Sequence, residues 1–426
     1  MGAILMGTFL LMLPISTTSG EGLDFLTALF TITSAVCVTG LSVIDISKEL
    51  SFTGQIFLLI FIQLGGLGIM TFSSFIFLLL RRKMSYGEKE LLKEERNVED
   101  TGGILKFLKK VILTVVTIEG IGSVFLTIKF VQEMPLLKAI YFGIFHSISA
   151  FCNAGFSLFT TGLEKYSDSI IINFTIAYLI ILGGIGFGVI DSILRSVRTK
   201  KYKLNLTVKV AIIMSCFLTI IGMVLFFVIE NSNGGTIGNM TFSEKLIASF
   251  FQSVTTRTAG FNTVPMGNLK PATIFLFCIL MFIGASPGST GGGIKTTTVG
   301  VLIVYVISIV KNRQHTTIFN RRIDWEVMNK AIAILIISLM YIIVVTMIML
   351  CVENFAPEAI IFEAVSAFGT VGLSVGITAD LGIVSKILLI CTMFLGRLGP
   401  MTLAIAFGGG KNVEKIVFPK ENIIVG

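Results

Sequence analysis

A glycine followed by a large apolar residue and then a small polar residue recurs four times in the chain, at Gly40, Gly155, Gly260 and Gly372. The spacings of 115, 105 and 112 residues indicate an internal repeat. Glycine adopts backbone angles that other residues resist, so it lets consecutive carbonyl groups point the same way. A ring of carbonyl oxygens can replace the hydration shell of a cation. One turn supplies a quarter of such a ring, and four turns in one chain could close it.

The two residues before each glycine complete the predicted set of cation-binding carbonyls. A single glycine turn would be an ordinary connection between helices, and that remains the alternative interpretation of all four. The repeated pattern favours a cation filter, in which each turn supplies three residues. The predicted filter residues are Val38, Thr39, Gly40, Asn153, Ala154, Gly155, Thr258, Ala259, Gly260, Thr370, Val371 and Gly372.

The composition is that of a polytopic membrane protein. Of the 426 residues, 54% are hydrophobic and 14% are charged, and the mean hydropathy is +0.91. A soluble domain has about 25% charged residues. The six cysteines form no CxxC or Cys/His pattern, so neither a disulfide framework nor a zinc site is indicated. The net charge of +8 does not predict a nucleic-acid partner, because the basic residues are sorted by loop.

Long apolar runs and shorter amphipathic segments alternate along the chain. The runs predict membrane-spanning helices, which need about 20 apolar residues each, and the shorter segments predict re-entrant pore helices that lead into the glycine turns. The runs are 2–16, 52–80, 104–130, 170–194, 207–229, 270–311, 327–350 and 382–407, and the pore helices are 24–36, 138–151, 243–256 and 357–368. The first run reaches only about 22 Å of a core about 30 Å thick. We therefore expect a missing N-terminal turn there; a signal peptide would need a preceding positive residue.

The predicted fold is an all-α membrane protein. It has four tandem repeats of helix, pore helix, filter turn and helix, in a pseudo-fourfold arrangement around one pore. The repeats span 1–80, 104–194, 207–312 and 327–408, the linkers 81–103, 195–206 and 313–326, and the tail 409–426.

The distribution of lysine and arginine predicts the orientation. The segments 81–110, 195–209, 311–330 and the tail from 411 carry 23 of the 33 basic residues, which places them and both termini in the cytoplasm. The filter turns then enter from outside. The C-terminal ends of the pore helices face the membrane centre, and their partial negative charge favours cations there.

A second motif follows each filter turn: LGGLG at 64–68, LGGIG at 182–186, IGASP at 283–287 and LGRLG at 395–399. Two copies depart from the pattern. The glycine-rich stretch 284–298 cannot hold a regular helix, and Arg397 replaces a glycine at membrane depth, where a charge needs a partner. We predict that the broken stretch is that partner and forms a gate below the filter. The predicted gate residues are Gly284, Ser286, Gly288, Ser289, Thr290, Gly291, Gly292, Gly293, Lys295 and Arg397.

Several of these predictions have plainer alternatives. The gate stretch could be a packing kink with an arginine bonded to a helix carbonyl. GSTGGGIKT lacks the spacing of a phosphate-binding loop, and Lys295 fits a lysine that extends toward the inner surface. Arg257 is predicted to support the filter from behind, against Glu363 or pore-helix carbonyls. Glu119 is either an interhelical pair or a dimer contact.

With these motifs the chain resembles the Trk/Ktr/HKT superfamily of potassium transporters, and within it the membrane subunits of bacterial Ktr systems. The resemblance covers essentially the whole chain and rests on the four turns, on TRTAGFNTV at 256–264, GASPGSTGGGIKTTT at 284–298 and GRLGP at 396–400, and on the terminal Gly426. It implies potassium bound at Gly40, Gly155, Gly260 and Gly372, with a gating loop at 284–293 facing Arg397. It also implies a homodimer on a cytoplasmic ring of nucleotide-binding regulatory subunits (KtrA-like), within membrane lipid.

The expected function is therefore potassium uptake across the cytoplasmic membrane through a gated pore driven by the membrane potential. In plant relatives a serine at the first filter position accompanies sodium selectivity, so Gly40 favours potassium. The alternative is a sodium- or proton-coupled secondary transporter, although such proteins have two inverted halves. Sodium activation stays open. No organic cofactor is expected in the chain, and no nucleophile–base or metal constellation predicts an enzyme.

Overall fold

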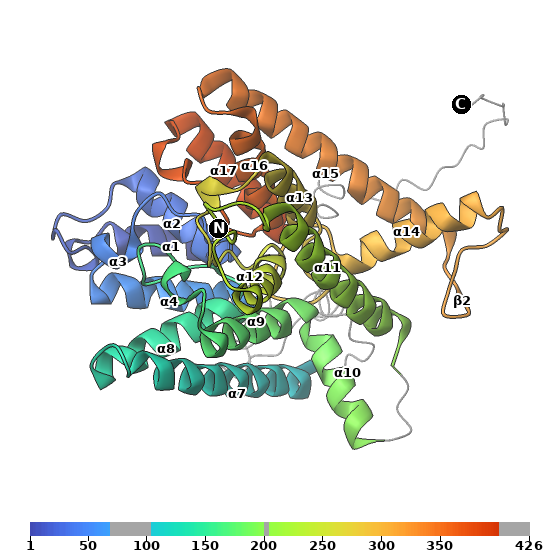
Figure 1. Cartoon of the computed structure of the whole chain (residues 1–426), viewed down its shortest axis with the longest axis horizontal. Helices are drawn as coiled ribbons and strands as arrows, with labels where there is room; N and C mark the ends of the chain where they lie inside the picture. Colours follow the sequence, from blue (N-terminus) through green and yellow to red (C-terminus); the bar gives the residue numbers. More distant parts are fainter. Residues whose placement is uncertain (69–103, 200–203, 400–426) are drawn as a thin grey trace.

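The computed structural model describes residues 1–68, 104–199 and 204–399 (Figure 1). The predicted linker 81–103, the tail 409–426 and the inner ends of the first and fourth repeats therefore lie outside the described residues. The described helices and strands are α1 (Gly2–Leu11), η1 (Pro14–Ser16), α2 (Phe25–Cys37), α3 (Ile46–Glu49), α4 (Phe52–Leu67), α7 (Ile104–Phe130), α8 (Leu136–Phe151), η2 (Glu164–Tyr166), α9 (Ile170–Ile185), α10 (Phe187–Arg198), α11 (Leu206–Glu230), α12 (Phe242–Thr255), η3 (Met266–Asn268), α13 (Pro271–Phe282), α14 (Thr296–Val310), β1 (Thr317–Ile318), β2 (Arg321–Arg322), α15 (Trp325–Val352), α16 (Pro357–Gly369), η4 (Thr378–Asp380) and α17 (Ile383–Leu398).

The four predicted pore helices are present as α2, α8, α12 and α16, with ends within two residues of the predicted ones. Their N-termini carry the expected start signals. The Asp24 side chain accepts hydrogen bonds from the amides of α2, and Thr241 and Glu244 form a capping box on α12. Pro357 occupies the first turn of α16, where a missing N–H costs nothing.

Three described helices are long and apolar enough to cross a membrane: α7, α11 and α15. Most of their surface is exposed in the isolated chain, and it carries large apolar side chains such as Phe125, Phe217 and Met340. In water this surface would be an aggregation hazard, whereas in a bilayer it faces lipid. In Figure 1, α7 runs beside α8 and α11 beside α12, so a long helix flanks each of these pore helices.

The prediction that 170–194 forms one helix is wrong. Gly186, with φ of 98°, separates α9 from α10, and the two helix axes differ by 98°. The described helices α4 and α17 likewise end at Gly68 and Gly399, with φ of 84° and 87°. An α-helix cannot continue through a residue with positive φ, so the last glycine ends a helix in three of the four copies of the motif, at Gly68, Gly186 and Gly399. The predicted break in 270–311 is present, since α13 and α14 leave 283–295 outside any helix.

The segment 313–326, predicted only as a linker, contains a β-hairpin. Thr317 pairs with Arg322 across a two-residue loop of Phe319 and Asn320, both with positive φ, as hairpin turns of type I′ require. Ile318 is buried against α11. The hairpin is therefore packed on the helices rather than free.

The apolar cores join successive segments of the chain and also join its two ends. One core combines α1, α2, α4, α8 and α9, and a second combines α11, α13 and α16. A third contains Phe30 of α2 together with Met349 of α15 and Met393 of α17. The last helices thus pack on the first, which closes the helices into a circle. The division into four equivalent repeats stays a prediction.

Glu230 fixes the C-terminal end of α11 to α13. Its fully buried carboxylate accepts hydrogen bonds from the Lys270 amide at 2.9 Å, the Thr236 hydroxyl at 2.7 Å, the Asn233 amide at 2.6 Å and the Thr273 hydroxyl. Replacing Glu230 with alanine leaves these donors unsatisfied. We expect the free energy of unfolding to fall by about 3 kcal/mol, measured as a lower melting temperature of the purified protein in detergent.

The matched control is Glu326→Ala, which removes an exposed carboxylate from the first turn of α15 and should leave the melting temperature unchanged. Equal melting temperatures for the two variants would contradict a stabilising role for Glu230.

Candidate cation pore

The four glycine turns have the same backbone conformation. The residue two positions before each glycine has positive φ, with values of 57°, 59°, 71° and 49°, and each glycine has φ of 96°, 69°, 77° and 90°. The residue between them has no positive φ. Because φ alternates in sign along each turn, successive carbonyl groups point in a similar direction. The four non-glycine residues in this disfavoured conformation are Val38, Asn153, Thr258 and Thr370.

The turns meet in a closed ring. A Cβ atom added to Gly40 would lie 2.6 Å from the carbonyl oxygen of Ala154, and one added to Gly155 would lie 2.7 Å from that of Ala259. In the same way a Cβ on Gly260 would collide with the carbonyl of Val371. The ring closes where a Cβ on Gly372 would collide with the carbonyl of Thr39. The structure therefore brings together the four glycines that the sequence predicted to converge, and only hydrogen fits as their side chain.

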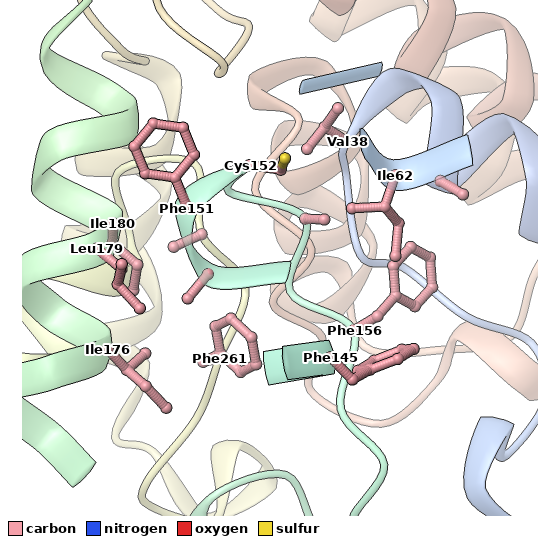
Figure 2. Close-up of a cluster of buried hydrophobic side chains, with 14 of the residues drawn as sticks. Val38, Ile62, Phe145, Phe151, Cys152, Phe156, Ile176, Leu179, Ile180 and Phe261 are labelled. Atoms are coloured by element: carbon pink, nitrogen blue, oxygen red, sulfur yellow. The ribbon is translucent and has the colours of Figure 1, made fainter. Parts of the chain in front are cut away.

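Hydroxyl groups of the pore helices hold the turns in place. Ser34 accepts a hydrogen bond from the Gly40 amide at 3.0 Å, and Ser366 accepts one from the Gly372 amide at 3.1 Å. In the other two turns the hydroxyl donates instead, Ser149 to the carbonyl of Phe156 at 2.8 Å. Figure 2 shows the second turn wedged between Val38 and Ile62 on one side and Leu179 and Ile180 on the other. This packing holds the backbone in its disfavoured angles.

A cavity of about 690 Å³ lies on one side of the ring. All four glycines line it, together with the carboxylates of Asp45, Glu49 and Glu164; its lining residues include no lysine, arginine or histidine. Burial raises the pKa of Asp45, but side-chain hydrogen bonds, with Ser47 the largest, outweigh it and hold the pKa below its usual value. Burial raises the pKa of Glu164 above its usual value. We call this cavity the vestibule; three of its lining residues are acidic, and Lys48 forms an ion pair with Asp45 at 3.3 Å.

The 284–293 segment contacts two of the four turns. Its two ends pair, with Ile283 bridged to Ile294. The Gly292 amide donates to the hydroxyl of Thr370 at 2.9 Å, and a Cβ on Gly291 would collide with the side chain of Thr258. Because Thr370 and Thr258 belong to the filter turns, the segment lies directly against them.

Arg397 is bonded to this segment, as the sequence predicted. Its guanidinium donates to the carbonyl of Thr290 and also to the carbonyl of Gly65 on α4. The Lys295 ammonium donates to the carbonyl of Gly291 at 2.9 Å. Arg397 and Lys295 thus both contact the 284–293 segment.

Comparison with known proteins identifies the family. The family model described as "TrkH: Cation transport protein" matches residues 4–415. The chain belongs to this TrkH family. It is 39% identical over 424 residues to the Ktr system potassium uptake protein B of Bacillus subtilis, which covers 99% of this chain and 94% of the relative. It is 35% identical to the protein of the same name from Vibrio alginolyticus, over 100% of this chain and 93% of the relative.

A third relative of this TrkH-family chain is the potassium/sodium uptake protein NtpJ of Enterococcus hirae, at 37% identity over 99% of this chain and 94% of the relative. The crystal structure of the potassium transporter TrkH from Vibrio parahaemolyticus has the same fold, with a TM-score of 0.73 at 18% identity, over 95% of this chain and 84% of that one. The all-helical membrane fold predicted from the sequence is thus confirmed. The TrkH-family chain is a multi-pass membrane protein.

The first glycines of the second motif lie against the ends of the pore helices in this TrkH-family protein. In three of the four copies of the second motif, the first glycine lies against the carbonyl group of the residue that is four positions before a filter glycine. A Cβ atom added to that first glycine would collide with the carbonyl oxygen. These three pairs lie at equivalent places, as the motif alignment predicted; they are Gly65 with Val36, Gly183 with Phe151, and Gly396 with Phe368.

The predicted partners of Arg257 are wrong. Its guanidinium donates to the Ser215 carbonyl at 2.9 Å, to the Ser215 hydroxyl at 2.9 Å and to the Thr219 hydroxyl at 3.2 Å, all on α11. Glu363 is bonded elsewhere. The sequence gives the position of Arg257 on the turn but not which neighbouring helix its long side chain meets.

Glu119 forms an interhelical contact, the first of its two predicted alternatives. The Gln63 amide of α4 donates to its carboxylate at 3.1 Å.

Sequence reasoning missed the positive φ of the residue two positions before each filter glycine. The four residue types at these positions have no common feature that would predict it. Sequence reasoning also missed the helix ends at Gly68, Gly186 and Gly399, for which the repeated glycine was a signal.

Proposed function

We propose that this chain is the membrane subunit of a potassium uptake system, in which potassium passes through the ring of glycine turns. The observation that carries the proposal is the closed ring of Gly40, Gly155, Gly260 and Gly372 beneath an acidic vestibule. Backbone carbonyls at that ring take over the coordination of a partly dehydrated cation. The names of the relatives from Bacillus subtilis and Vibrio alginolyticus support potassium as the ion.

The membrane potential drives the ion inward. It contributes about 2.3 kcal/mol per charge for each 100 mV, which supports large accumulation without a coupled ion. The four turns differ in sequence, so the ring offers fewer uniform sites than four identical turns would. We therefore propose a modest preference for potassium over sodium.

The 284–293 segment and Arg397 form the gate. The segment lies against the filter turns, and Arg397 places a positive charge beside it, bonded to Thr290 and Gly65. A cation leaving the ring meets both a steric and an electrostatic barrier. Movement of the segment away from Thr370 and Thr258 opens the path.

The alternative function is sodium- or proton-coupled transport. One observation favours a role for sodium, namely the name of the Enterococcus hirae relative, a potassium/sodium uptake protein. The relatives named as parts of a Ktr system support a multi-component assembly. We propose a homodimer on a ring of nucleotide-binding regulatory subunits, in the cytoplasmic membrane with both termini in the cytoplasm.

The test is rubidium and potassium uptake in a host that lacks its own potassium uptake systems, with and without sodium. The expected result is growth and rubidium uptake at low external potassium, which a proton uncoupler that collapses the membrane potential abolishes. No uptake by a chain that is present in the membrane would reject the proposal, and uptake only with sodium would favour the coupled alternative. Purified chain in liposomes with a potassium gradient gives the same comparison without other host proteins.

A further inference from the structure

Each pore helix has a buried polar residue behind its filter turn. The residue lies nine positions before the filter glycine in three of the helices and eight positions before it in α12. All four side chains are fully buried. They differ in chemical type, since they are Thr31, His146, Gln252 and Glu363.

In two of these helices the polar residue is bonded to the segment that leaves the turn. His146 lies 3.1 Å from the hydroxyl of Ser157, and the Gln252 amide donates to the hydroxyl of Thr263 at 3.3 Å. In α2 the hydroxyl of Thr31 has no hydrogen-bond partner within the part of the chain that the structure describes. His146 and Gln252 thus tie their pore helices to the segments that follow their own turns.

Glu363 makes the most extensive of these contacts. Its carboxylate accepts hydrogen bonds from the hydroxyl of Ser374 and, at 3.0 Å, from that of Thr378. Ser374 in turn accepts from the amide of Gly376 at 2.8 Å. The Thr378 hydroxyl also lies 2.9 Å from that of Ser374, so the carboxyl group and the two hydroxyl groups form one hydrogen-bonded network. Ser374, Gly376 and Thr378 all line the acidic vestibule.

We propose that Glu363 is a positioning residue for cation entry. It holds the vestibule wall beside the fourth turn and, in its ionised form, places a negative charge behind that wall. The threonine, histidine and glutamine of the other three helices supply no such charge. The charge is buried, so it is screened less by salt than the exposed carboxylates of the vestibule. It acts on the cation through Ser374 and Thr378 and stabilises an ion that arrives at the outer face of the ring. This inference rests on the proposed function.

The test separates charge from shape. Glu363→Gln keeps the size and a hydrogen-bonding end group but removes the charge, whereas Glu363→Ala removes both. The matched control is Glu358→Gln, which neutralises an exposed carboxylate in the first turn of the same helix. We expect Glu363→Gln to raise the KM for rubidium uptake about three- to fivefold with Vmax nearly unchanged, and Glu358→Gln to leave both values unchanged. Glu363→Ala should lower Vmax as well, because the wall loses its support.

A purely structural role would give a different pattern, with Glu363→Gln equal to the wild type and only Glu363→Ala impaired. That result overturns the inference while uptake by the wild type still supports the proposed function. Absence of uptake by the wild type rejects both. Size-exclusion profiles of the variants in detergent establish that each one folds. A second measurement is the potassium concentration that gives half of the maximal rise in melting temperature of the purified protein. For Glu363→Gln this concentration should rise by the same factor as KM.

Discussion

Replacing Gly372 with serine should bring the preference for potassium over sodium down to near equality. The serine Cβ would collide with the carbonyl of Thr39 in the neighbouring turn, and the φ of 90° at this position disfavours any side chain. The ring must widen locally to relieve the collision. A wider ring no longer places four sets of carbonyls at the distance that potassium requires, so the differential binding of the two ions is lost.

The measurement is rubidium uptake in competition with potassium and with sodium. The control is Gly20→Ser, which places serine at another positive φ of 75° where the added Cβ has no neighbour within 4 Å. It tests backbone strain away from the ring and should keep the wild-type preference. A Gly372→Ser protein with wild-type preference would count against the assignment of the filter.

Replacing Arg397 with glutamine should increase uptake by the chain on its own. The change removes a positive charge below the ring together with hydrogen bonds to the carbonyls of Thr290 and Gly65. Both losses lower the barrier to a cation that leaves the ring, because the repulsion disappears and the 284–293 segment is held less firmly. A barrier lower by about 1.4 kcal/mol gives about a tenfold higher rate.

Rubidium flux into liposomes that contain the purified chain measures this effect. Lys386→Gln is the control, since it removes a positive charge from the outer part of the same helix, where the ammonium is bonded to the Ala379 carbonyl. If Arg397→Gln and Lys386→Gln give the same flux as the wild type, Arg397 has no part in gating.

The sequence predicts the pore helices and the filter glycines well for a physical reason. An amphipathic segment about half as long as a membrane-spanning helix, followed by glycine, can adopt few stable structures at membrane depth. The sequence contains this pattern four times. The predicted ends of α2 and α16 are therefore correct to within a residue or two.

Contacts between distant segments are less predictable. The bend at Gly186 was missed because glycine is also tolerated inside a helix, and only the surrounding packing decides the sign of φ. The partners of Arg257 and Glu363 were missed because each long side chain can reach more than one neighbour. Which neighbour it meets depends on the rotation of α11, α12 and α16 about their axes, and that rotation is set by the whole core.

The ring of turns has an evolutionary consequence. In a channel made of four identical subunits, one codon change alters every corner of the pore at once. Here Gly40, Gly155, Gly260 and Gly372 are encoded separately, so a mutation changes one corner and leaves three intact. If the ring is the filter, natural selection can therefore test a change of ion preference at one corner while the other three glycines are kept.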